Sequence, residues 1–209
     1  RGKPAYTVSA IKGGQCMDTF DLYKDIQCRT NGEIYLGVVG PVRSGKSTFI
    51  KRFMELAVLP AMEDESLKAV STDELPQSAG GKTVMTTEPK FIPKEAVQIT
   101  LGDGIQAKVR LIDCVGYMGD GAAGHVENGE ERMVKTPWSE KEIPFTQAAQ
   151  IGTRKVIGDH STIGIVVTTD GSIGELKRSA YIDAEKQTVD ELKKLGKPFI
   201  LLLNSTKPH

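Results

Sequence analysis

A glycine-rich segment early in the chain carries the residue types best suited to phosphate chemistry. Gly40 and Gly45 would allow a tight turn in which successive backbone N–H groups, and the positive end of a following helix, face a phosphate chain. Lys46 would reach the β- and γ-phosphates, and the Ser47 hydroxyl would bind the accompanying magnesium ion. The segment therefore predicts a P-loop for a nucleoside triphosphate. The residues expected to bind it are Gly40, Pro41, Val42, Arg43, Ser44, Gly45, Lys46, Ser47 and Thr48.

An aspartate followed three residues later by a glycine forms the second motif. Asp113 comes at the end of an expected strand, where its carboxylate could hold magnesium directly or through water. The N–H of Gly116 could donate to the γ-phosphate. A plain turn is the alternative for so short a motif, but its distance downstream of the P-loop favours the nucleotide function. We therefore expect Gly116 to bind nucleotide as well.

Two adjacent threonines, Thr86 and Thr87, lie between these motifs. A nucleotide hydrolase of the switch type needs a hydroxyl there that reaches magnesium and the γ-phosphate only when a triphosphate is bound. The alternative is that both threonines belong to a strand edge, and the sequence does not decide which of the two would be the sensor. The expected catalytic residues are Lys46, Thr86, Thr87 and Asp113. The expected magnesium ligands are Ser47, Thr87 and Asp113.

The residues that would select the base depart from the common pattern. Asn204 is followed by Ser205, Thr206 and Lys207, where guanine-specific proteins carry Asn-Lys-x-Asp. The aspartate of that motif accepts two guanine N–H groups, whereas a lysine has no acceptor to offer. Adenine is therefore a credible base. Tyr117 also stands where a glutamine often orients the attacking water, so another group is expected to do so.

Strands and helices around these motifs predict an α/β fold with helices on both faces of the sheet. The sheet should be mostly parallel, with one antiparallel edge strand from a hairpin, and the strand and helix flanks argue against a chance P-loop match. Expected strands are 34–39, 97–101, 105–112, 162–168 and 199–203, and expected helices are 46–57, 145–156 and 178–195. Residues 62–82 are expected to form a long mobile loop, and residues 114–142 a glycine-rich, charged loop.

Composition indicates an ordinary globular chain. It has 209 residues, of which 39% are apolar, and its 27 basic residues balance its 27 acidic ones, so charge gives no reason to expect a nucleic-acid partner. Cys16, Cys28 and Cys114 are too scattered for a disulfide framework or a metal site, which favours a reducing cytoplasm. The sequence lacks an apolar run of ~18 residues and a signal-peptide core, so we expect a soluble, non-exported protein.

The chain is expected to hold one nucleotide-binding domain. Residues 1–16 precede Met17 and show no pattern, so we expect them to be a non-native or disordered extension. Residues 17–209 would form the domain itself. Because the last strand is expected to end at residue 203, close to the end of the chain, we also expect this domain to be truncated.

Longer stretches of sequence resemble one protein family. They are GPVRSGKST, DELPQSAGGKTVMTTEPKFIP, LIDCVGY, KTPW, IGTRKVI and HSTIGIVVTTDG. Together they are similar to the amino-terminal ATPase domain of the stage IV sporulation protein A family of endospore-forming bacteria. The resemblance covers residues 17–209, including loops that nucleotide binding alone would not dictate.

That resemblance implies a P-loop NTPase of the translation-factor-like GTPase class that hydrolyses ATP with Mg²⁺. It implies that the protein assembles with itself into a static polymer, which forms the basement layer of the spore coat at the forespore surface in the mother-cell cytoplasm. It also implies two kinds of partner, other spore coat proteins and a small amphipathic, membrane-associated anchor protein. These would bind through middle and carboxy-terminal regions that the present sequence lacks.

Two other functions are compatible with the motifs. One is a GTP-dependent regulatory switch of the ribosome-assembly or tRNA-modification type. The other is a scaffold that binds nucleotide only for stability. Lys207, at the position of the guanine-reading aspartate, is the feature that favours the ATPase.

Overall fold

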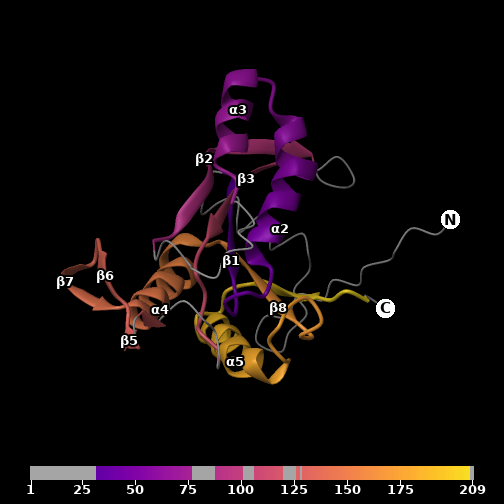
Figure 1. Ribbon diagram of the computed structural model, residues 1–209. Coiled ribbons are helices and arrows are strands. Elements are labelled where there is room, and N and C mark those ends of the chain that lie inside the picture. Colours follow the sequence, from indigo (N-terminus) through magenta and orange to yellow (C-terminus); the bar gives the residue numbers. More distant parts are fainter. Residues whose placement is uncertain (1–31, 77–87, 101–105, 120–125, 128, 208–209) are drawn as a thin grey trace.

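The computed structural model describes residues 32–76, 88–100, 106–119, 126–127 and 129–207 (Figure 1). Several sequence-based expectations lie outside these residues: the extension 1–16, Thr86 and Thr87, the hairpin turn at 102–104, and Cys16 and Cys28.

A mixed five-stranded sheet is the centre of the fold. Its order is β2-β3-β1-β8-β9, with all neighbours parallel except the antiparallel pair β2 and β3. The strands are β1 (Glu33–Val39), β2 (Lys90–Thr100), β3 (Gln106–Asp113), β8 (Ile163–Thr169) and β9 (Phe199–Asn204). The predicted α/β class and the single antiparallel edge strand are therefore confirmed.

The strand register brings the predicted motifs to one edge of the sheet. Val38, two residues before Gly40, pairs with Asp113 of β3, and Val39 pairs with Val166 of β8. At the far side of β8, Thr169 pairs with Asn204. Because the carboxyl ends of parallel strands meet at one edge, the loops that follow them can surround one ligand.

The central strands β1 and β8 are buried on both faces of the sheet, whereas Leu201 and Leu203 at the β9 edge are exposed. Alternate residues of each strand face opposite sides. Val38, Leu111 and Val167 pack with the helix that follows the P-loop, whereas Val39, Ile112 and Val166 pack with the later helices. These helices are α2 (Lys46–Phe53), α4 (Phe145–Lys155) with its π-helical continuation Val156–His160, and α5 (Ser179–Lys194). Figure 1 shows α2 on one side of the sheet, with α4 and α5 on the other. Within the described ranges, no helix is both long and apolar enough to cross a membrane.

The helix after the P-loop is longer than α2 itself. A π-helical turn, Met54–Val58, continues it, and a short 3-10 turn, Leu59–Ala61, ends it. Ile50, Met54 and Val58 are fully buried along this stretch and form one stripe against the sheet. The expected helix at 46–57 is thus present, and Pro60 lies in the terminating turn.

The expectation of a loop over residues 62–82 is wrong for its described part. Helix α3 (Glu65–Asp73) occupies the middle of this segment and packs beside the helix that follows the P-loop (Figure 1). The side chain of Asp64 caps it, accepting from the N–H of Ser66 at 2.8 Å and of Leu67 at 3.1 Å. Its apolar residues are weakly buried, Leu67 being 50% exposed, so the segment lacks the periodic stripe that predicts helices.

The expectation of a loop over residues 114–142 is also wrong in part. This segment contains two small hairpins, β4 (Val126–Glu127) with β5 (Glu130–Glu131), and β6 (Met133–Thr136) with β7 (Ser139–Pro144). Figure 1 shows β6 and β7 projecting away from the central sheet. The turn between them is Pro137-Trp138, and the ladder is irregular between Val134 and Thr136, so neither the turn nor the pairing has a common hairpin signature.

Candidate functional site

The P-loop backbone adopts conformations that its two glycines permit. Gly40 has φ +127° and a Cβ there would lie 2.4 Å from the carbonyl oxygen of Val167. Gly45 has φ +100° and precedes the first turn of α2, which has neither a side-chain cap nor an acidic residue. The helix N-terminus therefore presents uncapped N–H groups, which suits a phosphate.

Two further features of the P-loop are consistent with a bound anion. Arg43 adopts φ +63°, a conformation uncommon for residues other than glycine. The Ser44 hydroxyl is buried and has no hydrogen-bond partner within the described part of the chain. A buried hydroxyl without a partner is unfavourable, so the loop can gain hydrogen bonding when a ligand arrives.

Lys46 lies beneath the P-loop in a preset position. Its ammonium group donates to the carbonyl oxygens of Gly40 at 3.3 Å and Pro41 at 2.6 Å, and the residue is only 5% exposed. Burial lowers the pKa of Lys46, and the nearby Cys114 and the carboxylate of Asp113 oppose this shift. A lysine has three N–H donors, so one remains for a phosphate oxygen.

Asp113 lies at the carboxyl end of β3, beside the buried lysine. Burial raises the pKa of its carboxyl, while the positive charges of Lys46 and Lys90 and the Cys114 N–H lower it. The neighbouring Cys114 thiol is buried, donates to the Val38 carbonyl oxygen at 3.5 Å, and has its pKa raised by burial to about 11. The cysteine is therefore a neutral packing residue, and Asp113 is the group that can bind a cation.

Ser47 and Asp113 provide the kind of oxygen ligand that suits magnesium. Ser47, the second residue of α2, is half-buried, and its hydroxyl and the Asp113 carboxylate are hard oxygen ligands. Magnesium commonly takes one or two protein oxygens together with substrate phosphates and waters. The donor set therefore fits this ion.

The segment after Asp113 lies directly on the P-loop. Gly116 has φ +91°, and a Cβ there would lie 2.0 Å from the Gly40 carbonyl oxygen and 2.7 Å from the Lys46 ammonium. The Val42 N–H donates to the Tyr117 carbonyl oxygen at 3.0 Å. Only a glycine fits at position 116 in this arrangement.

The structure thus brings the P-loop residues 40–48, Asp113 and Gly116 to one place, which we call the phosphate end. Their catalytic and binding roles stay predictions, as do those of Thr86 and Thr87, which lie outside the described residues. Sequence reasoning missed Glu191 and Arg154, which hold the Tyr117 side chain from α5 and α4. Both are charged residues within helices, and no sequence motif predicts that they contact Tyr117.

The loops after β8 and β9, residues 170–178 and 204–207, form what we call the base end. Asn204 connects it to the phosphate end, because its amide donates to the Ser44 carbonyl oxygen at 3.2 Å. Lys207 contributes its backbone N–H to the Ser205 hydroxyl at 3.1 Å. The described structure therefore uses the asparagine of the altered motif to hold the P-loop.

Asp170 organises the base end, although it is not among the residues that the sequence motifs predict. Its carboxylate accepts from the N–H and hydroxyl of Ser172, at 2.8 and 2.6 Å, and from the Ser205 hydroxyl at 2.6 Å. The side-chain hydrogen bonds from Ser172 and Ser205 lower the pKa of Asp170 to about 2. An Asp-Gly-Ser sequence directly after a buried strand is a turn signal that could have indicated this role.

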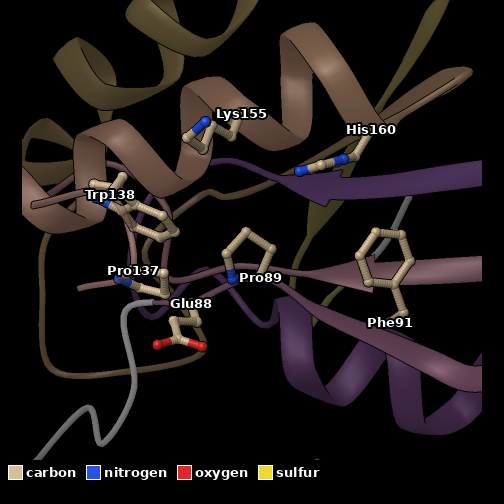
Figure 2. Close-up of a pocket in the computed structure, with 7 residues that line it drawn as sticks. All are labelled: Glu88, Pro89, Phe91, Pro137, Trp138, Lys155 and His160. Carbon is tan, nitrogen blue, oxygen red and sulfur yellow. The ribbon is translucent and has the colours of Figure 1, made fainter.

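A cavity of about 360 Å³ lies away from these two ends. Trp138 and Lys155 line one side of it, Phe91 and His160 the other, and Pro89 lies between them (Figure 2). The Lys155 ammonium lies 5.9 Å from the centre of the Trp138 ring. This cavity does not contain the P-loop, and nothing in its lining identifies a ligand.

Comparison with known proteins gives consistent family matches. The family model described as "Stage IV sporulation protein A, ATPase domain" matches residues 17–209. Proteins named stage IV sporulation protein A are 58% identical over 193 residues in Bacillus subtilis (strain 168), 57% over 193 residues in Bacillus anthracis, and 54% over 188 residues in Clostridioides difficile (strain 630).

These alignments cover most of this chain but less than half of each relative. They include 92%, 92% and 90% of the chain, and 39%, 39% and 38% of the three relatives. The chain therefore spans about two fifths of the length of the curated relatives it matches. Among solved structures, a dimerization-deficient mutant of Toc33 from Arabidopsis thaliana aligns over 91% of this chain and 78% of its own, with a TM-score of 0.33 and 11% identity. So weak a likeness carries no argument.

Proposed function

The chain belongs to the family of stage IV sporulation protein A ATPase domains, and we propose that it binds ATP with magnesium and hydrolyses the bond between the β- and γ-phosphates. The P-loop N–H groups and the uncapped start of α2 would hold the phosphates. The buried Lys46 would contribute its remaining N–H donor to the β- and γ-phosphates.

Within this proposal Ser47 and Asp113 would hold the magnesium ion. When bound, the ion would neutralise charge that develops on the phosphate oxygens. The place of Asp113 at the end of β3 would keep its carboxylate beside the phosphates, and Gly116 lies against the same loop, where its N–H could donate to the γ-phosphate. Thr86 or Thr87 would supply the sensor hydroxyl.

The residues at the base end are the observation that favours ATP over GTP as the substrate. Guanine recognition of the common type needs a carboxylate that accepts two N–H groups, and Lys207 stands at that position. The neighbouring carboxylate, that of Asp170, already accepts from Ser172 and Ser205. These residues therefore support a protein without the usual guanine contact.

The test is competition between ATP and GTP on the purified protein, with phosphate release as the readout. We expect ATP-dependent phosphate release that needs magnesium and that excess GTP inhibits weakly. Preferred hydrolysis of GTP would support the regulatory switch instead. Tight nucleotide binding without phosphate release would support the scaffold.

We further propose that the longer protein uses hydrolysis to assemble with itself into the basement layer of the spore coat, in the mother-cell cytoplasm at the forespore surface. The names of the relatives support a role in sporulation. Other coat proteins and a small amphipathic membrane-associated protein would be partners through regions outside this sequence. Sedimentation and negative-stain imaging with ATP, ADP or no nucleotide would test this, comparing the present chain with a full-length relative. Filaments that form equally well with ATP, with ADP and without nucleotide would contradict the proposal that hydrolysis drives assembly.

A further inference from the structure

Tyr117 occupies the position from which a glutamine often orients the attacking water, but its side chain turns away from the P-loop. The residue is 1% exposed and packs with Val156, Ile157 and Leu192 in the core between the sheet and the later helices. Its hydroxyl donates to one carboxylate oxygen of Glu191 in α5. That hydroxyl is therefore not available to a water beside the phosphates.

Glu191 is itself held from a second helix. Its other carboxylate oxygen accepts from the side chain of Arg154, in α4, at 3.1 Å. Burial, followed by the hydrogen bond and the negative charge of Glu191, raises the pKa of Tyr117, so the hydroxyl stays protonated and remains a donor. Three side chains from three parts of the chain thus form one connected hydrogen-bonded group.

The backbone of the same tyrosine lies against the P-loop. Its carbonyl oxygen accepts from Val42, and it forms a parallel bridge with Pro41. Two residues later, a Cβ at Gly119 would lie 2.0 Å from the Ala180 carbonyl oxygen, so the chain there lies directly on the start of α5. A shift of the Tyr117 side chain would therefore move main-chain groups that contact the phosphate-binding loop.

We propose that Tyr117 is a positioning residue for ATP hydrolysis: its hydroxyl, held by Glu191 and Arg154, fixes the backbone of residues 113–117 against the P-loop. A fixed main chain here takes the place of a mobile glutamine side chain as the feature that orders the γ-phosphate region. Such an arrangement lowers the barrier because the polar groups need no reorganisation during the reaction. This inference rests on the proposed ATPase function.

The alternative is that Tyr117 only fills the core, and steady-state kinetics separate the two roles. Tyr117→Phe keeps the ring and removes the hydrogen bond. We expect kcat to fall about 10-fold, because displacement of groups near the reacting atoms is costly. The KM for ATP should change less than about two-fold, because the P-loop and Lys46 remain. A residue that only supports packing would reduce the folded fraction and leave both constants of the remaining enzyme unchanged.

Conservative variants sharpen this test. Glu191→Gln keeps one oxygen that can accept from the tyrosine but turns an NH2 group towards Arg154, so it should retain part of the activity. Glu191→Ala should reproduce the loss seen in Tyr117→Phe. Combining Tyr117→Phe with Glu191→Ala should add little, since both remove one interaction. Tyr35→Phe is the matched control: it removes another tyrosine–glutamate hydrogen bond, to Glu33 at 2.5 Å, away from the P-loop. That variant should behave as wild type.

A second measurement reports the main-chain link directly. Amide hydrogen exchange at Val42 should be faster in Tyr117→Phe than in wild type or Tyr35→Phe, because its acceptor is less firmly held. If Tyr117→Phe does not fold, Glu191→Ala and Glu191→Gln provide the same comparison. Wild-type kcat in a folded Tyr117→Phe or Glu191→Ala protein, or an equal loss in Tyr35→Phe, would overturn the inference. Absence of ATP hydrolysis by the wild-type protein in the same assay would instead refute the proposed function.

Discussion

The phosphate end and the base end lie on the same edge of the sheet but are built differently. At the phosphate end, glycines bring backbone segments into direct contact, as where Gly116 lies on Gly40, and the lysine below them is buried. At the base end, exposed side chains carry the hydrogen bonds: Asp170 joins Ser172 to Ser205, and the Ser172 and Ser205 hydroxyls accept from the N–H groups of Thr206 and Lys207. One end depends on main-chain shape, and the other depends on side-chain identity.

This difference explains why one end matches a motif and the other does not. Main-chain N–H groups recognise any triphosphate, so the P-loop residues are restricted by the turn that they must form. Base recognition depends on individual acceptors and donors, which can be replaced while the surrounding loop keeps its shape. We therefore expect substitutions at the phosphate end to have the larger effects.

The largest effect is expected from Lys46→Ala. This change removes the buried ammonium that would face the β- and γ-phosphates, and loss of such a group typically lowers the rate at least ~100-fold. Phosphate release and ATP affinity should both collapse. Lys51→Ala is the matched control, since Lys51 lies on the same helix with a partly exposed side chain that pairs with Glu55 at 3.9 Å. Equal losses of phosphate release and ATP affinity in the two variants would show that the buried Lys46 has no special role.

Gly116→Ala should have the next largest effect, which has two causes: backbone strain at positive φ and steric overlap of the new Cβ. Gly129→Ala tests the strain alone. Both glycines have similar positive φ, +91° and +87°, but a Cβ at Gly116 would meet the P-loop, whereas one at Gly129 would meet nothing within 4 Å. Gly129→Ala should cost about 1 kcal/mol of stability from backbone strain alone. Gly116→Ala should cost about 3 kcal/mol, because overpacking adds to that strain, and it should abolish most hydrolysis. Thermal unfolding and phosphate release measure these effects, and similar behaviour of both variants would contradict the close-packing argument.

Asn204→Ala tests the connection between the two ends. It removes the amide that donates to the Ser44 carbonyl oxygen, so the P-loop loses one support while its own residues stay intact. We expect the KM for ATP to rise about 5-fold, the usual scale of one lost hydrogen bond, with a smaller change in kcat. Gln98→Ala, which removes an exposed amide of the edge strand β2 that donates to Gln106 of β3, should leave both constants unchanged. An unchanged KM in Asn204→Ala would mean that the two ends are independent.

The smallest effect concerns the pH dependence of the base end. The pKa of Asp170 is about 2, below its ordinary value of 3.8, because Ser172 and Ser205 donate to the ionised form. The stabilisation is therefore fully present above about pH 4 and is lost as the pH falls towards 2. A carboxyl NMR titration should show this low pKa, and Ser172→Ala should raise it towards the ordinary value. A normal pKa in the wild-type protein would show that the network does not form in solution.

The sequence predicts the strands and the long helices because each has a strong local signal. β1 and β8 are apolar runs, β3 alternates apolar with polar residues, and α5 combines a helical repeat with the terminating Gly196. Helix α3 and the hairpin of β6 and β7 were missed because their apolar residues are largely exposed and their stability comes from caps and neighbours. Weak burial leaves little periodicity to detect.

The same contrast applies to the candidate site. Gly40, Lys46 and Asp113 could be identified because P-loop chemistry needs these residue types at fixed spacings. The partners of Tyr117 could not, because Glu191 and Arg154 reach it only after two helices have packed against the sheet. Sequence spacing identifies groups that act through the local backbone, whereas contacts made across the fold need the structure.

The Asn204 contact with Ser44 also has a consequence for the order of folding. It joins residues 160 positions apart, the first in the loop after β1 and the second at the end of the last strand. During synthesis the P-loop leaves the ribosome early, but this support exists only after β9 has been made and has paired with β8. The nascent chain therefore carries its phosphate-binding sequence long before it can hold that sequence in its final shape.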